Sequence, residues 1–237
     1  MRQITRYTVA DRKIPDKITF AVVSDLHDRA WDDVLSDILG CDAVLVPGDL
    51  VDRHRKTYEN ALRFLREMPE KLPVFYSTGN HERRHRRADE FRQLAEETDA
   101  RILDNEMCLF RGIMLGGYSS AAEGEEDTSF LDRFEQAEAY KLLLCHHPEM
   151  YRRDVAGRNV NLTVCGHAHG GQIRIGGHSL YAPGQGLFPE MTYGFYDHER
   201  MLLSRGMTNG TFLPRINVPC ELIILTLEHR EENENER

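Results

Sequence analysis

Short apolar runs alternate with helix-like patterns through the first hundred residues of the chain. Residues 18–23, 43–46 and 74–76 are β-type runs, each followed within three residues by aspartate, proline or glycine. Between these runs, apolar residues recur at the spacing of one helix face. The first such face consists of Trp31, Val34, Leu35, Ile38 and Leu39. Strands that alternate with helices pair in parallel, because each helical crossover returns the chain to the same end of the sheet.

The second half of the chain contains further short β-type runs around glycine-rich turns. These runs are residues 107–110, 113–115, 142–144, 162–164, 173–175, 201–203 and 221–227. Together, the two halves predict an α/β fold with two packed mixed β-sheets flanked by helices, which is a four-layer α-β-β-α sandwich.

The length of 237 residues suits one domain, which we place at residues 1–227. Residues 228–237 are almost wholly polar or charged, and we expect them to form a disordered tail. Charged residues interrupt residues 1–20, so the sequence predicts neither a transmembrane segment nor a secretory leader. We therefore expect a cytoplasmic protein.

The net charge and the spacing of the cysteines argue against two classes of protein. A formal net charge of −9 counts against a protein that tracks a nucleic-acid backbone, although a local basic surface stays possible. The five cysteines are widely spaced and odd in number, which fits reduced thiols better than a disulfide framework.

Polar residues follow the ends of the predicted strands. They are Asp25, His27, Asp49, Asp52, Asn80, His81, His146, His147, His167 and His169. In an open α/β sheet, the loops at the carboxyl ends of the strands form the ligand site. Each short motif alone could be a turn or a helix cap, but five of them in order after apolar strands favour one shared site.

Carboxylate oxygens together with imidazoles suit Mn²⁺, Fe or Zn²⁺. Two ions with four or five ligands each require about seven side chains when one carboxylate is shared, and the loops supply that number. Two ions about 3.5–4 Å apart can clamp both oxygens of an in-line displacement at phosphorus. The sequence therefore predicts a cofactor of two divalent metal ions, with Mn, Fe and Zn left open.

Five motifs carry a resemblance to a known family. They are Asp25-x-His27, Gly48-Asp49-x-x-Asp52, Gly79-Asn80-His81-Glu82, His146-His147-Pro148 and Gly166-His167-x-His169. This set resembles the calcineurin-like metallophosphoesterases. The following Gly170-Gly171-Gln172 and the later strands resemble a branch of small bacterial phosphohydrolases, similar to UDP-diacylglucosamine pyrophosphohydrolase-like proteins.

The resemblance implies a role for each site residue. One metal ion would be held by Asp25, His27, Asp49 and His169, and the other by Asp49, Asn80, His146 and His167. Asp49 would bridge the ions, and His146 is preferred to His147 because the first histidine of the His-His-Pro motif is the usual ligand. His81 would act as general acid. Asp52 would accept a hydrogen bond from His81 or from a ligand imidazole, and Glu82 is a further supporting residue.

The implied reaction is hydrolysis of phosphomono-, phosphodi- or pyrophosphate esters by in-line attack of a hydroxide that bridges the two metal ions. The partner would be a phosphorylated small molecule or a lipid-linked phosphate. Two alternatives stay open: a nuclease on the same site, and a catalytically weak scaffold that metal ions stabilise.

Two segments could select the substrate. Basic clusters at residues 53–56 and 83–87 follow two of the metal loops, so Arg53, Arg83 and Arg84 are candidate phosphate ligands. The alternative is a solvated start of a helix that is paired with nearby acidic residues. The apolar residues of segment 181–196 could form a lip over the metal ions, or simply pack under a long hairpin.

Overall fold

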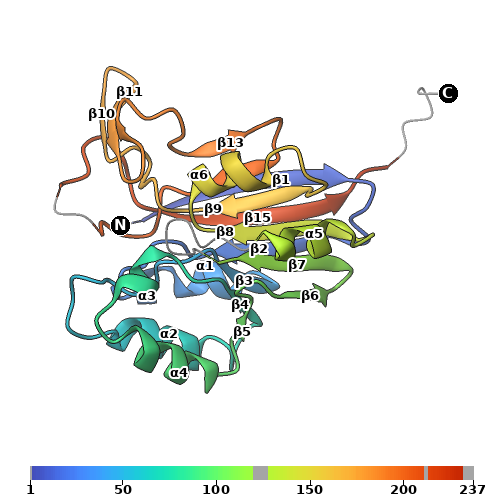
Figure 1. The fold of residues 1–237 in the computed structure, drawn as a ribbon, viewed down its shortest axis with the longest axis horizontal. Helices are drawn as coiled ribbons and strands as arrows, with labels where there is room; N and C mark the ends of the chain where they lie inside the picture. Colours follow the sequence, from blue (N-terminus) through green and yellow to red (C-terminus); the bar gives the residue numbers. More distant parts are fainter. Residues whose placement is uncertain (1, 120–127, 211–212, 232–237) are drawn as a thin grey trace.

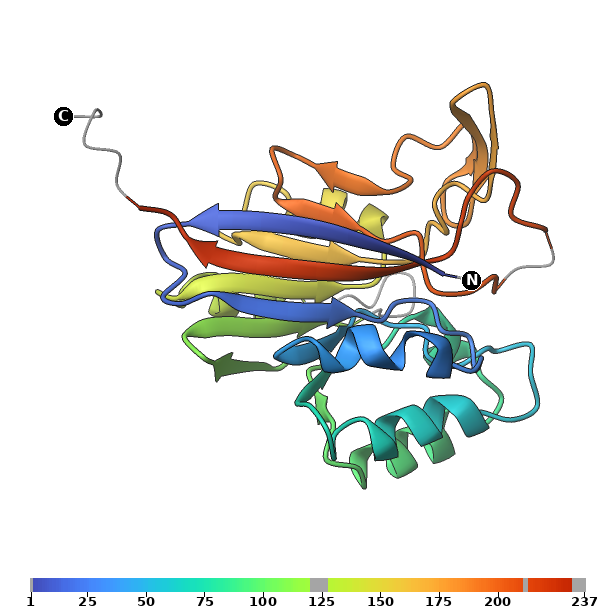
Figure 2. The ribbon, with the colours of Figure 1, turned by 180° about the vertical axis from the view of Figure 1, so that it is seen from behind.

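A computed structural model describes residues 2–119, 128–210 and 213–231. Its centre consists of two six-stranded sheets, whose arrangement Figures 1 and 2 show from opposite sides. Sheet A has the order β1 (Gln3–Asp11), β15 (Glu221–His229), β2 (Ile18–Val22), β3 (Ala43–Val46), β4 (Val74–Tyr76) and β5 (Arg101–Ile102). Sheet B has the order β13 (Gly194–Tyr196), β14 (Met201–Leu203), β9 (Leu162–Cys165), β8 (Tyr140–Cys145), β7 (Ile113–Tyr118) and β6 (Met107–Phe110). Both sheets contain parallel and antiparallel pairs, so the predicted mixed sheets are confirmed.

Helices cover the outer faces of the two sheets. The helices are η1 (Asp32–Val34), α1 (Leu35–Leu39), α2 (Glu59–Glu67), α3 (Asn80–Arg84), α4 (Ala88–Glu96), α5 (Ser129–Glu135), α6 (Pro148–Met150) and the π-helical turn η2 (Tyr151–Val155). One apolar core lies between sheet A and α1, α2 and α4, and another lies between sheet B and α5, α6 and η2. A third core fills the space between the sheets. Three cores separate four layers, as the sequence predicts.

Strand β3 shows how the sequence produces this layering. Ala43 and Leu45 belong to the core between the sheets, whereas Val44 and Val46 belong to the core under the helices. Successive side chains of a strand point to opposite faces, so a strand that is covered on both sides reads as a continuous apolar run. The unbroken run at residues 43–46 is therefore typical of a strand buried on both faces.

Strand β1 is an element that the sequence analysis did not predict. It is an edge strand that pairs in parallel with β15 over its whole length. Its residues are exposed or only half-buried, so charged side chains are tolerated and no apolar run marks the strand. A third sheet, formed by β10 (Ile173–Ile175), β11 (His178–Ala182) and β12 (Gly186–Leu187), was predicted only at its first strand.

The end of sheet A corrects the start of the predicted tail. Strand β15 continues to His229, which pairs with Asp11 of β1, so Glu228 and His229 belong to the domain. Residues 232–237 of the predicted tail lie outside the described residues. Within the described ranges, no helix has the length and apolar character that crossing a membrane requires.

The parallel strands bring their carboxyl ends to one region. The loop after β2 binds the loop after β3 through the main chain, because Asp25 N donates to Gly48 O at 3.2 Å and His27 N donates to Asp49 O at 3.0 Å. In sheet B, Gly166 N donates to His146 O at 3.0 Å and joins the loops after β8 and β9. These loops therefore form one continuous surface at the ends of the two sheets.

Candidate metal centre

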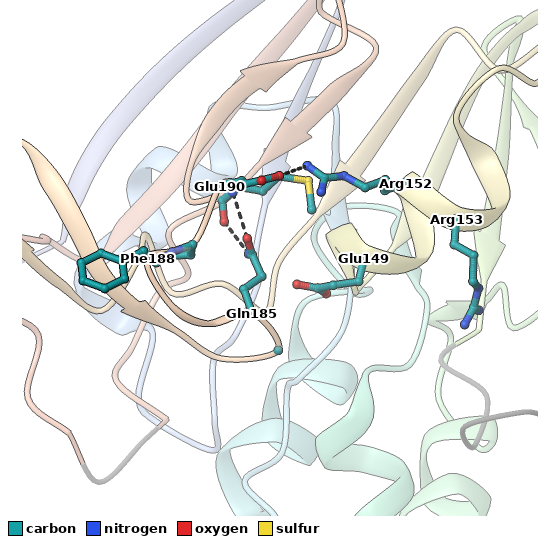
Figure 3. A pocket seen from close by; sticks show the side chains of 9 residues that line it. Glu149, Arg152, Arg153, Gln185, Phe188 and Glu190 are labelled. Atoms are coloured by element: carbon teal, nitrogen blue, oxygen red, sulfur yellow. Dashed lines mark hydrogen bonds and ion pairs between the residues drawn. The ribbon is translucent and has the colours of Figure 1, made fainter.

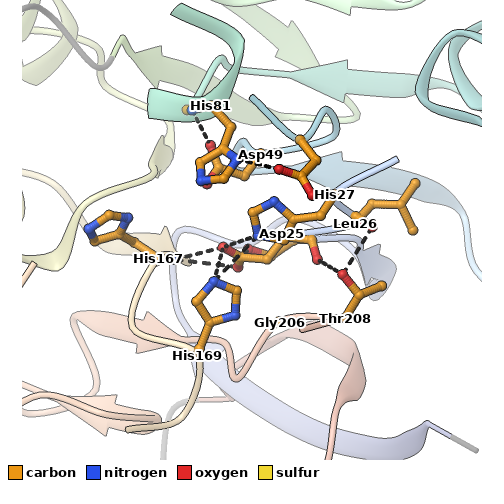
Figure 4. Close-up of polar contacts among 12 residues, drawn as sticks. Asp25, Leu26, His27, Asp49, His81, His167, His169, Gly206 and Thr208 are labelled. Carbon is orange, nitrogen blue, oxygen red and sulfur yellow. Dashed lines mark hydrogen bonds and ion pairs between the residues drawn. The ribbon is translucent and has the colours of Figure 1, made fainter. Parts of the chain in front are cut away.

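Three buried side chains form the first part of the candidate centre. The Nε2 atoms of His27 and His169 lie 3.4 Å apart, and each lies 3.9 Å from Asp25 Oδ1. These distances leave room for one ion that all three atoms could bind. Figure 4 shows the three side chains converging from the loops after β2 and β9. The structure thus brings together three of the four predicted ligands of one ion.

Asp49 connects this group to a second one. His146 Nε2 lies 3.1 Å from Asp49 Oδ2, and ligand atoms of Asp25, Asp49 and His146 lie within 4.8 Å of one another. His146 Nδ1 donates to the carbonyl of Pro47 at 2.9 Å, which turns Nε2 toward the cluster. This arrangement is the one expected of a metal-ligating histidine.

His167 extends the cluster on the side of His146. The main-chain N–H of His167 donates to both oxygens of Asp25, at 3.1 and 3.3 Å. Ring atoms of His146, His147 and His167 lie within 4.8 Å of one another. The structure therefore places His147 close to the second predicted ligand set, although the sequence analysis preferred His146.

Orphaned polar atoms show that the residues fit a metal centre. Asn80 Oδ1 and His27 Nδ1 are buried and make no hydrogen bond within the described residues, and His146 Nε2 faces the carboxylate of Asp49 at 3.1 Å. Burying a polar atom without a partner costs free energy, so such atoms are rare in folded proteins. A buried amide oxygen without a donor, such as Asn80 Oδ1, is a group that a divalent ion would satisfy.

Three of the four histidines predicted as ligands are held in the neutral form. Burial, reinforced by neighbouring imidazoles, lowers the pKa of His27 to about 3. Burial together with the Arg215 guanidinium lowers the pKa of His169 to about 3, and burial holds the pKa of His167 well below its usual value. These three rings are neutral at pH 7, as ligation requires. Burial opposes the shift at His146, but the Asp49 carboxylate raises the pKa of that ring to about 10.

His81 lies beside the cluster and is held by polar contacts on its far side. Its Nε2 lies 4.0 Å from Asp49 Oδ2, and its ring centroid lies 4.5 Å from that of His27. Its Nδ1 accepts a hydrogen bond from Arg53 N at 3.2 Å and lies 3.6 Å from Asp52 Oδ1. Because Nδ1 accepts, the neutral ring carries its proton on Nε2, which faces the cluster.

The two predicted supporting carboxylates have different surroundings. Burial opposes the shift at Asp52, but the neighbouring His81 ring and the hydrogen bond from the backbone N–H of His54 lower the pKa of Asp52 to about 2. Glu82 is fully enclosed, and burial followed by the repulsion of Asp49 raises the pKa of Glu82 to about 7. Asp52 is therefore an ionised partner for a cationic His81.

Glu82 joins the loops after β3 and β4. Its Oε2 accepts from Asp49 N at 3.0 Å and from Gly79 N at 2.8 Å, and its Oε1 accepts from Val51 N at 3.1 Å. Asp49 is further held because its Oδ1 accepts from His81 N at 2.8 Å. Glu82 thus fixes the positions of two metal loops through the main chain.

The last quarter of the chain supplies contacts that the sequence analysis missed. The Arg215 guanidinium lies 2.8 Å from His169 Nδ1. Thr208 Oγ1 donates to the carbonyl of Asp25 at 3.0 Å (Figure 4). Gly206 packs so closely that a Cβ there would lie 2.8 Å from the Cβ of Asp25. Gly206 follows strand β14 just as Gly48 follows β3, so the strand-then-glycine pattern was a usable signal.

The predicted substrate residues remain predictions. Arg53 contacts the site through its backbone, and its side chain points to His54, with Nε 3.2 Å from His54 Nε2. Arg83 and Arg84 are exposed, and neither forms an ion pair within the described ranges. In the predicted lip, Leu187 and Phe188 are 74% and 73% exposed, whereas Met191 is buried. The lip segment therefore packs in part and presents two apolar side chains to solvent.

Comparison with known proteins gives a family match. The sequence model of the calcineurin-like phosphoesterases matches residues 18–180. These residues include every predicted metal ligand.

Three curated proteins illustrate the similarity. The uncharacterized protein YpbG of Bacillus subtilis is 25% identical over 89% of this chain and 81% of its own length. An uncharacterized metallophosphoesterase of Aquifex aeolicus is 23% identical over 95% of this chain and 92% of its own length. The uncharacterized metallophosphoesterase Cj0846 of Campylobacter jejuni is 26% identical over 86% of this chain, but the match spans only 56% of that protein.

Proposed function

Because the chain belongs to the calcineurin-like phosphoesterase family and is a phosphoester hydrolase, we propose that its centre binds two divalent metal ions and hydrolyses phosphate esters there. Asp25, His27, Asp49 and His169 would hold one ion, and Asp49, Asn80, His146 and His167 would hold the other. Divalent ions at such a site supply electrostatic stabilisation of a phosphoryl group and a water that ionises near neutral pH. The branch of the family and the identity of the metal stay predictions.

One observation carries this proposal. The candidate ligand atoms form connected groups: Asp25 links His27 and His169 to the group with Asp49 and His146, and His146 links that group to His147 and His167, so Asp49 lies between the two outer groups. A single structural metal site would need only four of these residues. Two outer groups joined through a middle group that contains Asp49 suit two ions better than one.

His81 would deliver the proton that the leaving oxygen needs. Its Nε2 faces the cluster and carries the proton, while Asp52 stabilises the cationic form of the ring. A metal-stabilised scaffold would have no need of such a positioned acid, so His81 supports turnover over a scaffold role. A proton donor held within reach of the leaving group typically contributes 10²- to 10⁴-fold in rate.

The test is hydrolysis of p-nitrophenyl phosphate and bis-p-nitrophenyl phosphate by metal-free protein reloaded with Mn²⁺, Fe²⁺ or Zn²⁺. His81→Ala should lower kcat by about 10²-fold or more while leaving the metal content unchanged. The matched control is His198→Ala, which removes an exposed imidazole. Metal binding without any turnover would instead support the scaffold, and loss of metal from His81→Ala would overturn the acid assignment.

A further inference from the structure

A pocket of about 510 Å³ opens beside the metal centre, between helix α6 and the segment that follows strand β11 (Figure 3). Its lining includes Glu149, Arg152, Gly184, Gln185 and Phe188. None of these residues belongs to the proposed ligand sets or supplies the proton. The proposed hydrolysis at the metal centre therefore assigns no role to this pocket.

Gly184 connects the pocket to the metal centre. This residue has a positive φ of 76°, and a Cβ added to it would lie 2.7 Å from His167 Nε2 and 3.0 Å from Glu149 Oε1. The His167 ring and the Glu149 carboxylate thus approach the same point of the backbone. A group bound against Glu149 would lie next to a phosphate at the metal centre.

The Glu149 carboxylate lacks the partners that a buried carboxylate needs. Both of its oxygens are buried, and neither makes a hydrogen bond within the part of the chain that the structure describes. Figure 3 shows the carboxylate directed from helix α6 toward the loop of Gln185. Leaving a buried acceptor unsatisfied costs free energy, so the group is poised to accept hydrogen bonds from a ligand.

The opposite wall of the pocket is fixed and partly apolar. The Gln185 side chain binds both main-chain groups of Met191, donating to its carbonyl at 2.5 Å and accepting from its N–H at 2.9 Å. At the rim, Arg152 and Glu190 form an ion pair at 2.8 Å. Phe188 remains 73% exposed and offers a flat apolar surface. A wall of this kind suits the face of a sugar or a base.

Resting on the proposed phosphoesterase function, we propose that this pocket binds the alcohol part of a phosphate ester. It selects an alcohol part that carries several hydroxyls, such as the ribose of a nucleotide. Adjacent hydroxyls of that group donate to the two oxygens of Glu149, and the rest of the group packs on Phe188. A carboxylate accepts two hydroxyl donors without any change of charge in the ligand. The flanking Arg152 disfavours a metal ion as the occupant.

The experiment compares three p-nitrophenyl esters on the metal-loaded enzyme. They are the ester of uridine 5′-phosphate, the ester of 2′,3′-dideoxyuridine 5′-phosphate, and bis-p-nitrophenyl phosphate, which carries no hydroxyl. The wild type should prefer the ribose ester over the dideoxy ester by at least 10-fold in kcat/KM. Glu149→Ala should abolish this preference through a higher KM, with the metal content and bis-p-nitrophenyl phosphate hydrolysis unchanged.

Two further variants keep the test decisive. Glu190→Ala removes a rim carboxylate that already has a partner, so the ribose preference should persist. Phe188→Ala removes an exposed ring and should raise KM for both nucleoside esters several-fold. Equal wild-type rates on the ribose and dideoxy esters would overturn the pocket assignment while leaving the phosphoesterase intact. Inactivity toward all three esters would count against the proposed function itself.

Discussion

Asp25, His27 and Asp49 reach the metal centre from left-handed backbone, with φ of 53°, 48° and 56°. His167 and His169 do the same, with φ of 71° and 49°. This conformation costs a non-glycine residue about 1–3 kcal/mol, and it persists only where the surroundings impose it. A substitution in the centre can therefore act in two ways. It can replace an atom that would bind metal, or it can displace a neighbouring residue by steric clash.

Asp49→Asn should lose both metal and activity. Asparagine tolerates the left-handed backbone and nearly preserves the shape, so the change removes the negative charge rather than the fold. The measurement is metal content after dialysis, followed by the rate on bis-p-nitrophenyl phosphate. Asp99→Asn, at an exposed position, is the matched control and should behave as the wild type. Full metal occupancy in Asp49→Asn would refute the proposed bridging role.

Gly79→Ala should disturb the centre by steric clash alone. Gly79 has an ordinary φ of −99°, but a Cβ there would lie 2.3 Å from Asp49 Oδ1 and 2.7 Å from Asp49 N. Asp49 must then move, and we expect at least a 10-fold loss of kcat/KM. Gly40→Ala is the control, because its nearest contact would be 3.4 Å. Unchanged kinetics in Gly79→Ala would show that the position of Asp49 is not critical.

Among single residues, the sequence predicts the candidate ligands better than it predicts the residues that hold those ligands in place. Asp49 and His146 follow apolar strands, and the order of the motifs was enough to predict that they would meet. Arg215 and Thr208 lie far along the chain and carry no motif, so their contacts with His169 and Asp25 became visible only in three dimensions. Glu149 was missed because its significance depends on an absent partner, which no spacing reveals.

At the scale of elements, Asp28 joins the first metal loop to helix α2. Its Oδ1 accepts from Asn60 N at 2.7 Å and from Ala61 N at 3.1 Å, at the first turn of that helix. A carboxylate satisfies free N–H groups there and interacts favourably with the helix dipole. A residue 32 positions away from Asn60 thus caps the helix in place of a local residue.

Asp28→Ala should lower the free energy of unfolding by about 1–2 kcal/mol, because it leaves the first turn of α2 uncapped. Asp28→Asn keeps an acceptor and should cost less. Urea denaturation followed by circular dichroism would measure both. If the two variants were equally stable, the capping interpretation would fail.

The strands divide into two groups by how well sequence predicts them. Residues 43–46 and 74–76 are buried on both faces, and their predicted bounds match β3 and β4. Strand β1 has one partner and one open edge, so its pattern of charged and apolar residues predicted no element. The two-residue strands β5 and β12 depend on tertiary pairing, which local sequence does not encode.

At the scale of the whole molecule, the core between the two sheets keeps the ligand loops in register. Leu142 of β8 is fully buried in this core, whereas Leu109 of β6 is 63% exposed. The loops after β3 and β8 come from different sheets, yet His146 Nδ1 binds the Pro47 carbonyl. The spacing of the sheets therefore sets the spacing of the ligands.

Leu142→Ala should destabilise the protein by about 2–5 kcal/mol, because it opens a cavity between the sheets. Leu109→Ala, the same change at an exposed site, should stay within about 0.5 kcal/mol of the wild type. Urea midpoints with unchanged m-values would give both differences. Similar losses in the two variants would contradict the layered arrangement of the core.

The pairing of β1 with β15 has a consequence for how the protein is made. Strand β15 lies between β1 and β2 in the sheet. During synthesis, β1 therefore has no partner strand until residues 221–229 have been made. Gly206 and Thr208, which support Asp25, also arrive late in synthesis. A nascent chain that ends before Gly206 contains every proposed ligand residue but lacks this support. The contacts that support Asp25 can therefore form only after the last quarter of the chain has begun to appear.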